Sequence, residues 1–194
     1  AIGAIVTPIL RGMISGPVPL ALLDKPQSGT GASLLAEAVA LVATGTAATM
    51  ETAPERADEW SKTILSCLLT GRSIVIFDNI EGRFYAPALA IALSSTVYGG
   101  RVLGRSEDVS ISHRVSWFAT GINIQLSGDL PRRCYWIRMD AKSARPWTGR
   151  TVDGQPVKFK HPKLKEWTIE NRGRIIDRET LLEPEHMTIP DERL

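Results

Sequence analysis

The chain has 194 residues with 23 basic and 21 acidic side chains, and hydrophobic residues make up 43% of it. This length predicts one domain with its own core, and the composition excludes a disulfide-rich scaffold and a disordered chain. The longest apolar stretches, 1–10 and 34–43, are shorter than the roughly 18 to 20 residues of a membrane helix, so we expect no membrane partner.

The two cysteines, Cys67 and Cys134, form no metal-binding spacing and lie far apart, so we expect a reducing, cytoplasmic location and no structural zinc. The chain begins with Ala and shows no signal-peptide pattern, so we expect a fragment or a domain of a longer protein. His113, His161 and His186 have no partner at ligand spacing and are predicted to be surface or loop residues.

The first predicted strand covers 19–23, a short, continuous apolar run suited to a strand buried on both faces. A loop with Pro and Gly follows at 24–31, and residues 32–43 are rich in helix formers and stop at Gly45. The sequence therefore predicts a strand, a glycine-rich loop and a helix in immediate succession.

Residues 73–79 carry the strongest strand signal, four apolar side chains that end at Asp78. Residues 120–123 are predicted to be a loop because Gly and Asn favour turns. The other predicted elements are strands at 46–50, 115–119 and 135–139 and helices at 54–70 and 86–96. Strands that alternate with helices predict an α/β fold with a parallel sheet of about five strands between two helix layers.

Residues 1–140 are predicted to form the core, and the character of the chain changes after them. Residues 141–162 are polar with several Gly and Pro, 164–176 are predicted to be one more helix, and 183–194 are acidic with two prolines. We therefore expect a linker, a shortened helical lid and a loose acidic tail over 141–194.

Positive charge concentrates in residues 101–150, which hold nine basic and four acidic side chains. Eight of the nine are arginines, and arginine binds phosphate through two parallel hydrogen bonds. An anionic partner, nucleotide or nucleic acid, is one interpretation. The alternative is that these arginines are solvated or paired with carboxylates of the same domain. Trp147 lies among the basic loop residues of this block, where a base could stack.

The loop before the helix resembles in part the phosphate-binding motif G-x-x-x-x-G-K-[ST], whose backbone N–H groups surround an anion at a helix N-terminus. In the window 26–33, Gly31 and Ser33 match the motif, whereas Pro26 replaces the first glycine and Ala32 replaces the lysine. Lys25 lies just upstream and is a candidate replacement cation, although an ordinary solvated lysine is the alternative. A chance glycine turn before a helix would leave the same pattern.

The carboxylate at the end of the second apolar strand is suited to hold Mg²⁺ through water, as in P-loop ATPases. Such strands often continue with a Glu that acts as base, but Asn79 stands there and cannot accept a proton. Either Glu81 or another group assists, or hydrolysis is feeble. The alternative is that Asp78 only caps a turn.

Four blocks in order, PVPLALLDKPQSGTGASLLAEAV, SIVIFDNI, GGRVLGRSED and WFATGINIQLSGDLPRRCYWIRMD, resemble the ATPase domain of AAA+ type, helicase-like replication proteins of phages, plasmids and other mobile elements. The resemblance covers roughly residues 5–175. It implies a three-layer αβα P-loop NTPase fold, ATP and Mg²⁺ as cofactors, DNA as a partner, and a homo-oligomer such as a hexamer.

The resemblance also implies roles for single residues. Asp78 matches Walker B, Asn123 the sensor that contacts the γ-phosphate or the attacking water, and Arg132 and Arg133 an arginine finger that acts on a neighbouring subunit's nucleotide. Gly104 and Arg105 match a block at the subunit interface. Candidate catalytic residues are thus Asp78, Asn79, Asn123, Arg132 and Arg133; candidate nucleotide-binding residues are Lys25, Gln27, Ser28, Gly29, Thr30, Gly31, Ala32 and Ser33; and candidate Mg²⁺ residues are Ser33 and Asp78.

Two functions remain open at this point. The first is the ATP-binding motor of a helicase-like replication protein, with hydrolysis impaired by Ala32 and Asn79. The second is a degenerate P-loop scaffold without catalysis. For the arginine pair, the alternative to a finger is a surface pair bridged to Asp129 or Asp140.

Overall fold

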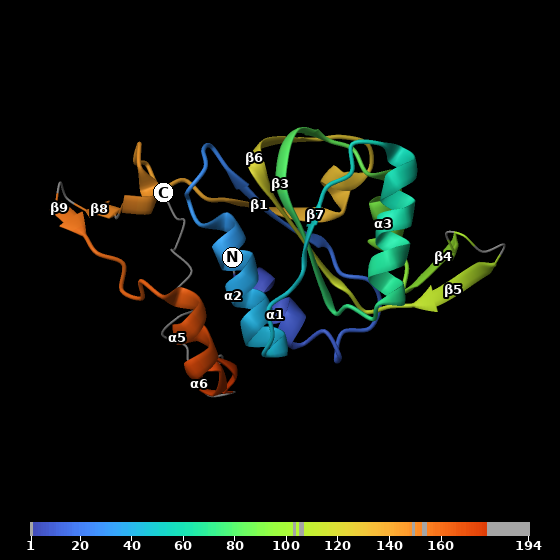
Figure 1. The fold of residues 1–194 in the computed structure, drawn as a ribbon, viewed down its shortest axis with the longest axis horizontal. Coiled ribbons are helices and arrows are strands. Elements are labelled where there is room, and N and C mark those ends of the chain that lie inside the picture. Colours follow the sequence, from blue (N-terminus) through green and yellow to red (C-terminus); the bar gives the residue numbers. More distant parts are fainter. Residues whose placement is uncertain (1, 103, 105–106, 149, 153–154, 178–194) are drawn as a thin grey trace, which may run out of the picture.

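A five-stranded, all-parallel sheet forms the centre of the protein in the computed structural model, which describes residues 2–102, 104, 107–148, 150–152 and 155–177 (Figure 1). Its strand order is β2-β3-β6-β1-β7. The strands are β1 (Leu20–Lys25), β2 (Met50–Thr52), β3 (Ile74–Phe84), β6 (Ser116–Leu126) and β7 (Cys134–Arg138). The predicted α/β class and strand number are confirmed.

Helices cover both faces of this sheet, as Figure 1 shows for α2 (Ala32–Thr44) and α3 (Ala57–Leu69). In β1, Leu20 and Leu22 pack with α3, whereas Ala21 and Leu23 pack with α2, because side chains alternate along a strand. Helix α1 (Ile2–Ile9) lies on the α2 face and α4 (Pro87–Ala92) on the α3 face. Burial on both faces explains the continuous apolar run of β1.

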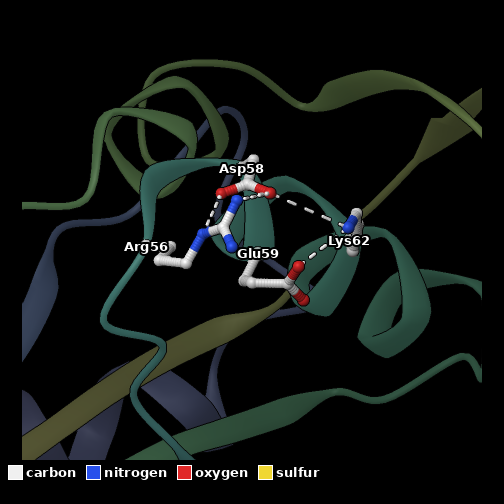
Figure 2. A network of polar contacts seen from close by, with 4 residues as sticks. All are labelled: Arg56, Asp58, Glu59 and Lys62. Carbon is white, nitrogen blue, oxygen red and sulfur yellow. Dashed lines mark hydrogen bonds and ion pairs between the residues drawn. The ribbon is translucent and has the colours of Figure 1, made fainter.

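A group of four exposed charged residues marks the start of α3 (Figure 2). The Arg56 guanidinium contacts the Asp58 carboxylate at 3.0 Å, and the Lys62 ammonium contacts Glu59 at 2.8 Å and Asp58 at 3.9 Å. Asp58 and Glu59 lie in the first turn, where negative charge favours the helix. These side chains are about half exposed or more, so water screens the pairs and they contribute little to stability.

Several smaller elements lie outside the central sheet. They are the hairpin of β4 (Val97–Arg101) and β5 (Asp108–Ser112), the hairpin of β8 (Arg150–Val152) and β9 (Gln155–Val157), the 3₁₀ turns η1 (Leu130–Arg132) and η2 (Pro146–Thr148), and helices α5 (Leu164–Glu170) and α6 (Arg172–Ile176). Arg172 of α6 donates to the carbonyl oxygen of Val42 at 2.8 Å and so holds the end of α2. None of the helices in the described residues is both long and apolar enough to cross a membrane.

The structure differs from the sequence-based prediction mainly in β3 and β6. The strand predicted at 73–79 continues to Phe84, so Asp78 lies within β3 and not at its end. Residues 120–123, predicted to be a loop, continue the strand to Leu126. Gly121 is required there by close packing, since a Cβ at this position would lie 2.1 Å from the carbonyl oxygen of Ile80. The predicted helix at 164–176 is divided at Asn171 into α5 and α6, and the predicted acidic tail and Arg105 lie outside the described residues.

His113, predicted to be a surface or loop residue, lies in the loop between β5 and β6, but it is buried at 8% exposure and makes an edge-to-face contact with Trp117. Burial lowers the pKa of His113 below 6.5, and the nearby Arg11 guanidinium lowers it further. Just below pH 6.5, His113 is therefore protonated in the unfolded chain but stays neutral in the folded chain. We expect the free energy of unfolding to be unaffected above this pH and to fall by up to about 1.4 kcal/mol per pH unit below it.

Urea unfolding between pH 7.5 and 5.0 measures this loss. A His113→Gln variant, which does not titrate, should have a flatter profile over the same range. Equal slopes in the two proteins would show that another group is responsible.

Candidate functional site

The loop at 26–31 leaves the carboxyl end of β1, the edge of a parallel sheet at which ligands bind in open α/β folds. Its Gly29 has a φ of 77°, a conformation that favours glycine, and Gly31 (φ 91°) directly precedes α2. The first intrahelical bond runs from Leu35 N–H to the Gly31 carbonyl at 2.8 Å. The N–H groups of the preceding residues therefore have no carbonyl within the helix and are available to an anion.

A carboxylate and two hydroxyls meet beside this loop. Ser33, in the first turn of α2, donates to Asp78 Oδ1 at 2.6 Å, and Thr120 of β6 donates to the same oxygen at 2.5 Å. The Thr120 hydroxyl in turn accepts the backbone N–H of Asn79 at 3.3 Å. Ser33 and Asp78, the two predicted Mg²⁺ residues, are 45 positions apart in the sequence and are in direct contact in the structure. The sequence analysis did not identify Thr120 as a residue of this site.

Both predicted asparagines have left-handed backbones. The φ angle is 58° at Asn79 and 48° at Asn123, which lie within the neighbouring strands β3 and β6, and the register of this pair of strands is irregular between Phe77 and Ile80. Asn tolerates this region better than most residues, and such conformations concentrate at functional sites. The irregularity exposes both side chains at the edge of the sheet that carries the loop.

An ion pair between a buried carboxylate and a half-exposed arginine positions Asn123. Asp24, which is fully buried, forms an ion pair with Arg138 and accepts the N–H of Ile124 at 3.0 Å. Arg138 also donates to Asn123 Oδ1 at 3.0 Å, and the Asn123 amide donates to the Pro26 carbonyl at 3.3 Å. The predicted sensor is therefore tied to the predicted phosphate loop. The available signal for Asp24 was a carboxylate that directly follows the apolar run of β1.

The remaining loop residues differ in their surroundings. Lys25, the last residue of β1, is 7% exposed, and no ion pair or hydrogen bond of its side-chain ammonium is found among the described residues. The Thr30 hydroxyl is buried without a hydrogen-bond partner in the described part of the chain, and Ser28 is exposed. The Gln27 amide donates to the Ser143 carbonyl, and Ala32 is fully buried and brings no charge.

The arginine pair lies at the opposite edge of the sheet. Arg133 immediately precedes β7, and its carbonyl accepts the N–H of Leu20 at the start of β1 at 2.9 Å. Arg132 and Arg133 contact Asp129 at 2.5 and 3.2 Å, and the Arg132 hydrogen bond and charge lower the pKa of Asp129. The pairing with Asp129, given above as the alternative to an arginine finger, is present in the structure, and these arginines do not join Asp78 within one chain.

Metal-binding and nucleophilic side chains add no second centre in the described ranges. No group of three His, Cys, Asp or Glu residues that could hold a metal by itself is found there. A Mg²⁺ ion at Ser33 and Asp78 would therefore take most ligands from phosphate and water, as this ion usually does. Burial raises the pKa of the Cys67 thiol to about 11, so it stays protonated at neutral pH and is a poor nucleophile.

The sequence matches no protein-family model, and a search of curated proteins finds no match. The functional assignment therefore rests on the chemistry of the site itself.

Proposed function

We propose that this chain is an ATP-binding domain of the P-loop class, the motor module of an AAA+ type, helicase-like replication protein in which hydrolysis is weak. The observation that carries the proposal is the 2.6 Å hydrogen bond between the hydroxyl of Ser33 and the carboxylate of Asp78. In Mg²⁺-nucleotide sites of this class, a hydroxyl in the first turn after the loop binds the ion and a strand-end Asp holds the ion from the other side. The bond puts both groups within reach of one ion.

The surrounding residues support the same assignment. The N–H groups at the start of α2 face the loop and can bind phosphate oxygens, and Asn123 is held beside Pro26, where it can reach the end of a triphosphate. Asn79 can position a water but cannot take its proton, and Ala32 leaves the loop without the usual cation. These two substitutions are the reasons for weak hydrolysis.

Oligomer formation and DNA binding belong to the same proposal. Because Arg132 and Arg133 lie at the edge opposite the loop, they can complete only the site of a neighbouring copy. The basic residues of 101–150, among them the exposed Arg101, Arg114, Lys142 and Arg145, give the surface an affinity for phosphate. The second candidate, a non-catalytic scaffold, is favoured by Ala32 and Asn79.

Calorimetric titration with MgATP tests the proposal. We expect binding with a submillimolar Kd that requires Mg²⁺, and an Asp78→Asn variant should bind about 10- to 150-fold more weakly, since a hydrogen bond to a charged group contributes about 1.5–3 kcal/mol. Asp58→Asn, the same substitution on the exposed surface of α3, is the matched control and should bind like the unaltered protein. No heat up to millimolar MgATP would favour the scaffold.

A further inference from the structure

Trp147 lies directly on the phosphate loop, although it is 118 positions after Gly29 in the sequence. A Cβ placed on Gly29 would lie 2.5 Å from Cε3 of the indole and 3.3 Å from Cζ3, so the ring contacts the glycine backbone itself. A second contact ties the same segment down, because the Gln27 side chain donates to the Ser143 carbonyl. The segment after β7 is therefore held against the loop at two points.

The direction of a bound triphosphate follows from the strand order. Asp78 and Asn123 belong to β3 and β6, on one side of β1, whereas Trp147 follows β7, on the other side of β1. If the terminal phosphate lies toward Asp78 and Asn123, the remaining part of the nucleotide leaves the loop on the β7 side. Trp147 lies on that side.

The exposure of the indole also needs an explanation. Trp147 is 58% exposed while one part of its ring rests on the loop, so a large apolar surface faces solvent beside a site for an anion. A nucleotide carries anionic phosphates and a flat aromatic base. The phosphates match the anion site at the loop, and the base matches the exposed indole. Arg145, two residues away and exposed, adds positive charge at the same place.

We infer that Trp147 is the stacking surface for the base of the nucleotide whose phosphates bind the loop at 26–31. The inference rests on the proposed ATP-binding function and adds a residue outside the loop and strand residues of that site. It assigns the ligand as a nucleoside triphosphate recognised through its base as well as its phosphates. Gly29 has a second role in this arrangement, since any side chain there would displace the indole.

The test compares a ligand that has a base with one that lacks it. MgATP and magnesium tripolyphosphate are titrated into the unaltered protein, Trp147→Ala and Trp147→Phe. We expect Trp147→Ala to weaken MgATP binding about 5- to 150-fold, the equivalent of about 1–3 kcal/mol for one stacked base, and to leave tripolyphosphate binding unchanged. Trp147→Phe should keep most of the MgATP affinity. Trp136→Ala, a substitution at another half-exposed tryptophan, on β7, is the matched control and should change neither ligand.

The outcomes separate this inference from the proposed function. Unchanged or tighter MgATP binding by Trp147→Ala would overturn the stacking role and leave the phosphate site standing. An equal loss for both ligands would overturn it too, since Trp147 would then only support the loop. A loss of affinity for a single-stranded oligonucleotide alone would assign the indole to nucleic acid instead. If the unaltered protein binds neither MgATP nor tripolyphosphate, the proposed function fails and the stacking role fails with it.

Discussion

Replacing Ala32 by lysine is expected to tighten MgATP binding by about 10- to 150-fold. Ala32 is the first residue of α2 and directly precedes Ser33, so a lysine there adds a cation at the N-terminus that faces the loop. A charge-assisted hydrogen bond to a phosphate oxygen contributes about 1.5–3 kcal/mol, from which the range follows. Calorimetric titration of both proteins with MgATP measures the change.

The control for this substitution is Ala32→Met, which adds a side chain of similar length without charge. Ala32 is 1% exposed, so either long side chain has to leave the core, at a cost of about 1–3 kcal/mol in stability that melting curves of the two variants record. Only the lysine should improve affinity. If lysine and methionine have the same effect, the loop does not bind phosphate, and the scaffold interpretation is favoured.

The Arg138→Met substitution is expected to lower the free energy of unfolding by about 2–3 kcal/mol. It removes the ion-pair partner of the fully buried Asp24. The Asp24 carboxylate then keeps the hydrogen bond from the Ile124 N–H but has no positive charge to balance its own. Breaking a fully buried pair costs about 3–5 kcal/mol, and the smaller value follows because the Arg138 side chain is 47% exposed. Urea unfolding at pH 7 measures the change.

Two further variants test whether the unpaired Asp24 carboxylate causes the loss of stability in Arg138→Met. Adding Asp24→Asn to Arg138→Met removes the unpaired carboxylate and should restore at least half of the lost stability. Arg132→Met breaks a pair whose arginine side chain is 75% exposed, so it should lower the stability much less than Arg138→Met does. Equal losses for Arg138→Met and Arg132→Met would contradict the role assigned to Asp24.

The parts of the site that could be predicted lie in continuous segments. The apolar runs of β1 and β3 and the glycines before α2 are local patterns, and they were sufficient to select Ser33 and Asp78, which hydrogen-bond in the structure. That the loop binds ATP remains a prediction. Thr120, Arg138 and Trp147 contact the site from strands and turns far away in the sequence, and no local pattern records such pairings.

The error in β6 has a physical cause. Gly121 and Asn123 were interpreted as turn residues, because glycine and asparagine adopt left-handed backbones at low cost. In the sheet, Gly121 admits the close carbonyl of Ile80, and Asn123 takes a φ of 48° within the strand. Glycine and asparagine are favoured in an irregular strand pair as well as in a turn, so the sequence alone does not distinguish the two structures.

The position of β1 in the sheet also determines when the loop can form during folding. The neighbours of β1 are β6 and β7, with Ala21 opposite Phe118 and Tyr135, so β1 pairs only with strands synthesised much later. Sheets built from such distant pairings fold slowly, and an unpaired apolar strand is prone to aggregate. A nascent chain that ends before β6 presents β1 with two open edges. We therefore expect the glycine loop to acquire its shape late in folding.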